Sequence, residues 1–149
     1  MFRRILVGVD GSEVSLAAAA AAGRLATEGG GDVTICHVVA PAPVFVDAAA
    51  LTLVEYDRRA AEESGRILQQ ARARLPAELH VEEKVLHGQP ASSLVEEARL
   101  RGYDLLVVGS HGRSGIRRFL LGSVASQVVA HAPIPVLVHR DSQGVSEPS

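Results

Sequence analysis

The chain has 149 residues, of which 47% are hydrophobic and 21% are charged, and this length and composition indicate one globular domain with a packed core. The formal net charge is −2 and aromatic residues make up 3%, without tryptophan, which argues against binding to nucleic acid or anionic lipid through bulk charge or base stacking. A single cysteine excludes an internal disulfide framework, and no spacing of Cys and His is that of a zinc site.

Neither a signal peptide nor a membrane span is evident. The N-terminus runs directly into an apolar segment at 5–9, without the long apolar region and small-residue cleavage site of a secretory signal. No apolar run approaches the ~20 residues that cross a bilayer. We therefore expect a cytoplasmic protein whose partners include neither nucleic acid nor a membrane.

Short apolar segments alternate with helical patterns along the chain. The expected elements, in chain order, are a strand at 5–9, a helix at 15–28, a strand at 33–39, a helix at 51–75, a strand at 79–86, a helix at 90–101, a strand at 104–108, a helix at 123–131 and a strand at 136–138. The segments 5–9 and 104–108 are apolar on both faces, as buried parallel strands are. The segment 79–86 alternates apolar and polar residues and is expected near a sheet edge.

This order of elements predicts an α/β fold. Strands separated by helices need right-handed crossovers, so we expect a single-domain, open, five-stranded parallel sheet with helices on both faces, a Rossmann-like arrangement. The domain is expected to span 1–141, and the polar tail 142–149 to be disordered. The stretch 40–50 is the one loop long enough to act as a flap.

Two strand ends carry the candidate chemistry, because open parallel sheets bind ligands beyond the carboxyl ends of their strands, where the strand order reverses. After the fourth strand, Gly109 and Gly112 allow tight turns and a close approach of a ligand to the backbone. Gly122 and Ser123 open the last helix, whose free N–H groups favour an anion. With Arg113 nearby, this pattern predicts a phosphate-binding loop. The alternative is a flexible turn in which Ser123 is a plain N-cap.

Asp10 and His111, which follow these two strands, each allow two interpretations. Asp10, after the first strand, can accept hydrogen bonds from ribose hydroxyls or can close an Asx turn that caps the first helix. His111, inside the glycine-rich loop, can donate to a phosphate or complete a turn. Cys36 lies within an apolar strand and is expected to be inert core packing.

The glycine-rich loop also carries a resemblance to a known family. Gly109, Gly112, Gly122 and Ser123 keep the spacing of a long motif: Gly, two residues, Gly, nine residues, Gly, then Ser or Thr. In this the chain resembles the nucleotide-binding subgroup of the universal stress protein family, and the resemblance spans nearly its whole length. Further segments similar to family signatures are Ile5–Ser12, His37–Val38, Val107–Gly112 and Pro135–Val138.

The resemblance implies a site for ATP or a related adenine nucleotide, with Mg²⁺ or Mn²⁺ bridging its phosphates. Asp10 is implied to face the ribose, the backbone of Val9 and Val38 the adenine, and Arg113 a phosphate. Ala125 departs from the pattern, because some family members carry a hydroxyl there, so one phosphate hydrogen bond is expected to be missing or supplied differently. The candidate site comprises Val9, Asp10, Val38, Val108, Gly109, His111, Gly112, Arg113, Gly122, Ser123, Val124 and Ala125.

The same resemblance implies the strand order 3-2-1-4-5 and a homodimer. Family members pair through the last strand, here Val136, Leu137 and Val138. An edge strand that is apolar on both faces invites pairing with another chain. The alternative is an edge covered by the tail of the same chain.

Two functions from different classes follow. The first is a cytoplasmic stress-response module that senses ATP and passes the bound state to partners. The second is an enzyme, either a slow ATPase or an autophosphorylating protein with Ser110, Ser114 or Ser123 as acceptor. Label on the protein, or metal-dependent phosphate release from γ-labelled ATP, would favour the enzyme. Nothing in the loop resembles a catalytic base positioned on a water, and the Walker A, G-x-G-x-x-G and G-x-S-x-G motifs are absent.

We therefore favour the binding module. A third interpretation is a family member that has lost nucleotide binding, and the intact glycines of the motif argue against it.

Overall fold

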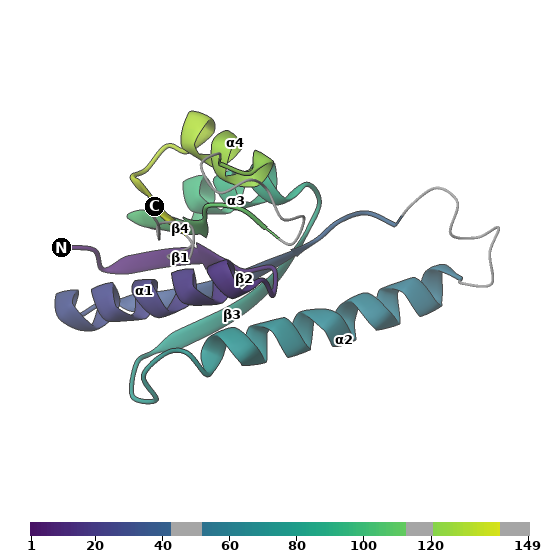
Figure 1. Cartoon of the computed structure of the whole chain (residues 1–149), viewed down its shortest axis with the longest axis horizontal. Coiled ribbons are helices and arrows are strands. Elements are labelled where there is room, and N and C mark those ends of the chain that lie inside the picture. Colours follow the sequence, from purple (N-terminus) through teal and green to yellow (C-terminus); the bar gives the residue numbers. More distant parts are fainter. Residues whose placement is uncertain (43–51, 113–120, 141–149) are drawn as a thin grey trace, which may run out of the picture.

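The computed structural model describes residues 1–42, 52–112 and 121–140. The chain forms a five-stranded sheet in the order β3-β2-β1-β4-β5, in which all neighbouring strands are parallel (Figure 1). The strands are β1 (Arg4–Gly8), β2 (Asp32–Val39), β3 (Val81–His87), β4 (Leu105–Gly109) and β5 (Val136–His139). The helices are α1 (Glu13–Gly29), α2 (Leu53–Arg72), α3 (Pro90–Arg101) and α4 (Ser123–His131). The expected parallel α/β architecture and the strand order are confirmed.

Helices cover both faces of the sheet, α1 and α2 on one side and α3 and α4 on the other (Figure 1). Successive side chains of a strand point to opposite faces. In β1, Ile5 and Val7 therefore pack into the cluster with α1 and α2, and Leu6 packs into the cluster with α3 and α4. All three side chains are fully buried, which explains why this strand is apolar without alternation.

Small side chains let α1 lie close to the sheet. Ala18, Ala22 and Ala26 have no exposed surface and belong to the core cluster on this face. The helix begins two residues before the expected start, because the Ser12 hydroxyl accepts a hydrogen bond from the third helical N–H and caps it. It ends at Gly29, and its C-cap is Gly30, whose φ of 68° is the left-handed conformation that glycine adopts without strain.

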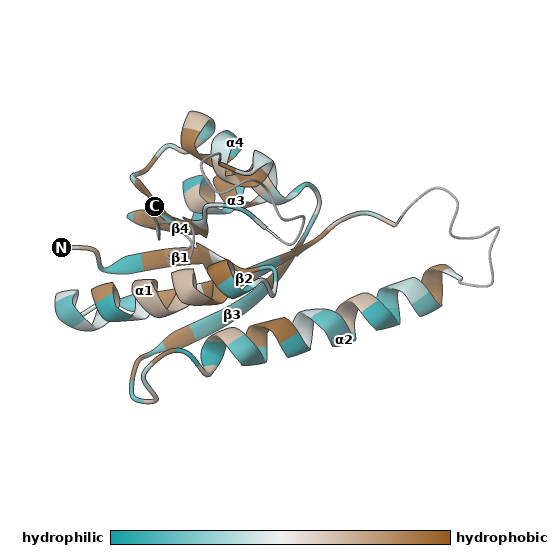
Figure 2. Cartoon of the chain, viewed as in Figure 1, coloured by the Kyte–Doolittle hydropathy of each residue, from teal (hydrophilic) through white to brown (hydrophobic). Residues whose placement is uncertain are grey.

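Helix α2 is amphipathic and shorter than expected. Figure 2 shows hydrophobic and hydrophilic residues alternating along it, and the Thr52 hydroxyl caps its first turn. The expected end was residue 75, but the helix ends at Arg72. The N–H groups of Arg74 and Leu75 bond to carbonyls three residues earlier, at 3.0 and 3.1 Å, so the helical pattern continues in tighter turns.

Strand β3 is an edge strand, as its alternation predicted. It begins at Val81 rather than at residue 79, because the N–H of Leu79 donates to the Pro76 carbonyl in a turn at 3.2 Å. Glu82 and Glu83 are exposed on this strand. Charged residues on an edge oppose pairing with another chain.

Two expectations lie outside the described residues. The expected flap at 40–50 falls largely within 43–51, and the expected tail at 142–149 falls within 141–149. Among the helices of the described part, none combines the length and the apolar character needed to cross a membrane.

Candidate functional site

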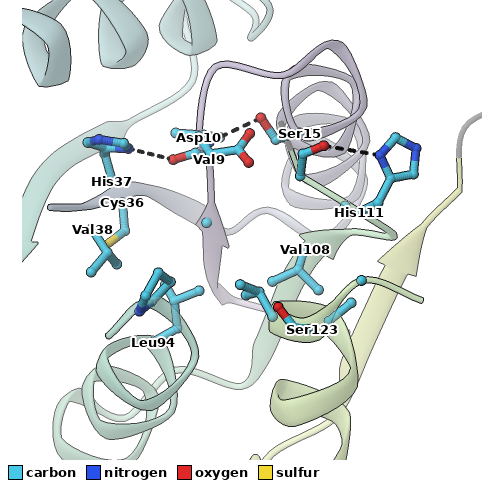
Figure 3. A pocket seen from close by; sticks show the side chains of 17 residues that line it. Val9, Asp10, Ser15, Cys36, His37, Val38, Leu94, Val108, His111 and Ser123 are labelled. Carbon is cyan, nitrogen blue, oxygen red and sulfur yellow. Dashed lines mark hydrogen bonds between the residues drawn. The ribbon is translucent and has the colours of Figure 1, made fainter. Parts of the chain in front are cut away.

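A cavity of about 230 Å³ lies at the carboxyl ends of β1, β2 and β4 (Figure 3). The chain leaves β1 to form β2 on one side of it, and β4 lies on the other side. The cavity is therefore at the point where the strand order reverses, which is where open parallel sheets bind ligands. Its lining residues are Gly8, Val9, Asp10, Ser15, Cys36, His37, Val38, Pro90, Leu94, Val108, Gly109, His111, Gly112, Gly122, Ser123, Val124 and Ala125.

The structure brings the two expected strand ends together around this cavity. The residues of the candidate site that line it are Val9, Asp10, Val38, Val108, Gly109, His111, Gly112, Gly122, Ser123, Val124 and Ala125. Arg113 lies outside the described residues. Their contact with a ligand remains a prediction. Lining residues that sequence reasoning did not place in the site are Gly8, Ser15, Cys36, His37, Pro90 and Leu94.

The turn between β1 and α1 holds Asp10 by a compact set of hydrogen bonds, of which Figure 3 shows the one between Asp10 and Ser15. One carboxylate oxygen, Oδ1, accepts the N–H of Ser12 at 2.9 Å. The N–H of Asp10 donates to the Ser15 hydroxyl at 3.2 Å, and that hydroxyl donates to the Ser12 carbonyl at 2.9 Å. The Asx turn considered from the sequence is therefore present, and it uses one carboxylate oxygen and leaves Oδ2 without a partner among the described groups.

Gly112 gives room to this carboxylate. A Cβ at position 112 would lie 2.6 Å from Oδ2 of Asp10, so any side chain there would force this carboxylate away from its position. The positive-φ glycines of the described residues do not include Gly109, Gly112 or Gly122, so tight left-handed turns are not the reason for these glycines. At Gly112 the close neighbour is the Asp10 carboxylate.

The other two motif glycines lie close to neighbouring residues, so a side chain at either position would be tightly packed. A Cβ at Gly109 would meet Val14 Cγ1 at 3.2 Å and the Ser15 nitrogen at 3.3 Å, where α1 begins. A Cβ at Gly122 would lie 3.0 Å from the Cα of His111. The N–H of Gly122 also donates to the Ser110 carbonyl at 2.6 Å, which closes the loop at its base.

Helix α4 starts at the cavity without a side-chain cap. Its N-cap is Gly122, and no side chain hydrogen-bonds to its first turn. The alternative in which Ser123 is the N-cap is therefore wrong: Ser123 is the first helical residue, and it is exposed. The first N–H groups of a helix have no partner within it and carry the positive end of the helix dipole. The residues that carry these N–H groups, Ser123, Val124 and Ala125, line the cavity, so this wall of the site favours an anion.

The wall opposite is apolar and comes from β2 and α3. Val38, Leu94 and Pro90 line it (Figure 3). The Nδ1 of His37 lies 2.9 Å from the Val9 carbonyl, and because a carbonyl only accepts, this nitrogen carries the proton. That hydrogen bond ties the ends of β1 and β2 together at the cavity.

Cys36 belongs to the hydrophobic core and also lines the floor of the cavity. Its side chain is fully buried, as expected of inert packing, and it lines the cavity beside Leu94. Burial, together with the smaller effect of the nearby Glu97 carboxylate, raises the pKa of the Cys36 thiol from its ordinary value of 9.0 to about 12. The thiol is therefore protonated and unreactive at neutral pH.

Charge and metal-binding groups are sparse in the site. Among the described lining residues, Asp10 is the only Asp, Glu, Lys or Arg. No group of three or more His, Cys, Asp or Glu in the described part could hold a metal ion. Of the serines considered as phosphate acceptors, Ser110 is buried, Ser114 lies outside the described residues and Ser123 is exposed.

Comparison with known proteins shows the family to which this chain belongs. A family model described as the universal stress protein family matches residues 1–140. The chain belongs to this family, as its resemblance implied. The universal stress protein MJ0531 of Methanocaldococcus jannaschii is 35% identical over 140 residues, which cover 93% of this chain and 82% of that protein.

Two other universal stress proteins are similar to this chain over most of its length. The universal stress protein YxiE of Bacillus subtilis is 34% identical over 151 residues, which cover 94% of this chain and 100% of that protein. A solved universal stress protein in complex with cAMP has a TM-score of 0.67 and 29% identity, and the match covers 93% of this chain and 97% of that one.

Proposed function

We propose that this chain binds an adenine nucleotide in the cavity at the carboxyl ends of β1, β2 and β4. The observation that carries the proposal is the N-terminus of α4, which has no side-chain cap and lines one wall of the cavity. The wall formed by Val38, Pro90 and Leu94 is apolar. A nucleotide needs both surfaces, one for its base and one for its phosphate. A family member 29% identical to this chain was solved in complex with cAMP, which supports the choice of ligand.

The parts of the nucleotide have distinct places in this proposal. The adenine lies against Val38 and Leu94, and the ribose hydroxyls bond to Oδ2 of Asp10. The phosphate accepts hydrogen bonds from the first N–H groups of α4. A volume of about 230 Å³ is below the usual 300–1,000 Å³ of ligand pockets, so the cavity suits the nucleoside, with the phosphates at its mouth.

For ATP, we further propose that Mg²⁺ or Mn²⁺ binds through the phosphates. Such an ion needs no protein ligand cluster, since phosphate oxygens and water supply the octahedral coordination that Mg²⁺ requires. It also offsets the charge of the triphosphate near Asp10. Calorimetric titration of ATP with and without Mg²⁺ measures this contribution.

We further propose that the protein is a homodimer in the cytoplasm, and that its nucleotide-bound form acts on partner proteins. The two sheet edges differ: β3 carries the exposed charges Glu82 and Glu83, whereas β5 consists of Val136, Leu137, Val138 and His139. Charged edges oppose pairing and uncharged edges permit it. The contrast supports dimerisation through β5.

A charge placed at the start of α4 tests the proposed phosphate site. Ser123→Glu puts a carboxylate where the phosphate is proposed to bind, and Glu in the first helical turn is compatible with the fold because it favours the helix dipole. We expect AMP to bind at least tenfold more weakly, which corresponds to about 1.4 kcal/mol. Adenosine, which lacks the phosphate, is expected to bind with unchanged affinity.

The matched control is Gln127→Glu, which adds the same charge at an exposed position one turn further along α4. It is expected to leave both affinities close to those of the wild type. Equal affinity of AMP for the wild type and Ser123→Glu would contradict the placement of the phosphate.

A further inference from the structure

We propose that Ser15 is a positioning residue of this site, whose hydroxyl fixes the backbone of Asp10 so that Oδ2 faces the ribose. The inference deepens the proposed function and rests on it. Ser15 belongs to α1 and is not part of the glycine-rich motif. Its side chain nevertheless lines the cavity, and the residue is 4% exposed.

The hydroxyl and the main-chain N–H of Ser15 make hydrogen bonds within the turn that carries Asp10. Its hydroxyl oxygen accepts the N–H of Asp10 at 3.2 Å, and its hydroxyl proton goes to the Ser12 carbonyl at 2.9 Å. Its own N–H donates to the Ser12 hydroxyl at 3.2 Å. The proton of the Ser15 hydroxyl is therefore already used, and the group acts on the turn.

Asp10 is consequently held at two points. Ser15 holds its main-chain N–H, and the N–H of Ser12 holds Oδ1. The remaining oxygen, Oδ2, has no hydrogen-bond partner among the described groups and points toward Gly112, where even a Cβ would stand 2.6 Å away. A carboxylate fixed in this way accepts ribose hydroxyls without first being ordered, so less free energy is lost on binding.

Loss of the Ser15 hydroxyl should therefore act selectively. In Ser15→Ala the N–H of Asp10 loses its partner, and the turn can relax toward solvent to satisfy it. The base and phosphate sites lie on other elements and are unchanged. The variant should weaken the part of binding that depends on ribose hydroxyls and leave the rest.

Two ligands separate these contributions: AMP, and 2′,3′-dideoxy-AMP, which has no ribose hydroxyls. We expect the wild type to prefer AMP by roughly tenfold or more, as for a hydrogen bond to a charged group. In Ser15→Ala, we expect most of this preference to be lost while the affinity for the dideoxy nucleotide stays the same. Calorimetry measures the affinities, and thermal unfolding shows that the variant is folded.

Ser12→Ala is the matched control, because it removes a hydroxyl from the same turn. It loses the cap of α1 but keeps the N–H that binds Oδ1 of Asp10. It should lower the melting temperature and keep the preference for AMP. In an Asp10→Ala background, Ser15→Ala should cause no further change in the preference.

Each possible result bears on the positioning role of Ser15. A Ser15→Ala variant that keeps the wild-type preference, or that loses affinity equally for both nucleotides, would overturn the positioning role. A wild type that binds both nucleotides equally well also overturns it, while leaving the proposed function in place. A wild type that binds neither nucleotide refutes the proposed function, and the role of Ser15 with it.

Discussion

Single residues explain which parts of the site the sequence could reveal. Asp10 and Gly112 were predictable because each follows an apolar strand, and strand ends meet at one edge of a parallel sheet. Their mutual constraint was not, since the approach of Oδ2 to position 112 depends on how the two loops fold toward each other. Cys36 and Leu94 were also not placed in the site, because interior strand and helix positions reach a cavity only through tertiary packing.

Ser64 in α2 is a polar residue at a buried position. It is 1% exposed, and its hydroxyl has no hydrogen-bond partner in the described part of the chain. An unsatisfied buried hydroxyl costs about 1–3 kcal/mol. We therefore expect Ser64→Ala to stabilise the fold by about 1 kcal/mol, or to raise the melting temperature by roughly 2–4 °C.

Ser126→Ala in α4 is the control for helix propensity, because Ser126 is exposed within a helix. It should give a smaller gain, since alanine there improves only the intrinsic helix preference. Chemical denaturation of both variants measures the difference. A Ser64→Ala protein less stable than the wild type would show that the hydroxyl has a partner.

The buried thiol of Cys36 makes the stability of the fold depend on pH in the alkaline range. Its pKa is raised from 9.0 to about 12 in the folded state by burial, so above pH 9 the unfolded chain releases a proton that the folded chain keeps. The contribution is fully present below pH 9 and is lost as the pH rises toward 12, by about 1.4 kcal/mol per pH unit. The raised pKa values of Tyr103 and Lys84 act in the same direction.

Urea unfolding at pH 9, 10 and 11 tests this with Cys36→Ala. The variant is expected to be less stable throughout, because it leaves a small cavity, but its stability should fall less steeply with pH than that of the wild type. Parallel curves for the two proteins would contradict the shifted pKa.

At the scale of elements, β5 shows how an edge strand can be exposed along its backbone and covered on its faces. Val136 and Val138 pack against the core on the α3 and α4 side, and Leu137 packs on the other side. The carbonyl of Pro135 accepts a hydrogen bond from Leu106 of β4 at 3.0 Å, and that of His139 accepts one from Ser110, the residue after β4, at 2.8 Å. Main-chain groups alternate along a strand, so those of Val136 and Val138 point away from the sheet.

This geometry selects the variant that tests dimerisation through β5. Val138→Pro removes one outward N–H and no hydrogen bond to β4, whereas lysine at Val136 and Val138 would also disrupt the core. We expect Val138→Pro to be a folded monomer and Val138→Ala, which keeps the N–H, to be a dimer. Analytical ultracentrifugation gives the masses; a Val138→Pro protein of dimer mass, or a monomeric wild type, would rule out this interface.

The elements themselves were largely predictable from periodicity, and their ends less so. Every expected strand and helix is present. The start of α1 and the end of α2 differ because a hydroxyl cap and a tighter last turn decide them, and neither changes the hydrophobic pattern.

For the whole molecule, the alternation of strands and helices was sufficient for the fold class and not for the strand order. Right-handed crossovers fix the parallel sheet, but the position of β4 next to β1 came from the family resemblance. That position matters most for function, because it creates the strand-order reversal at which the cavity lies.

A crystal structure of the protein with AMP is the direct test of nucleotide binding in this cavity. We expect a phosphate within hydrogen-bonding distance of the first N–H groups of α4, ribose hydroxyls at Oδ2 of Asp10 and adenine against Val38. A cavity that stays empty at saturating AMP, or a nucleotide bound elsewhere on the molecule, would contradict it.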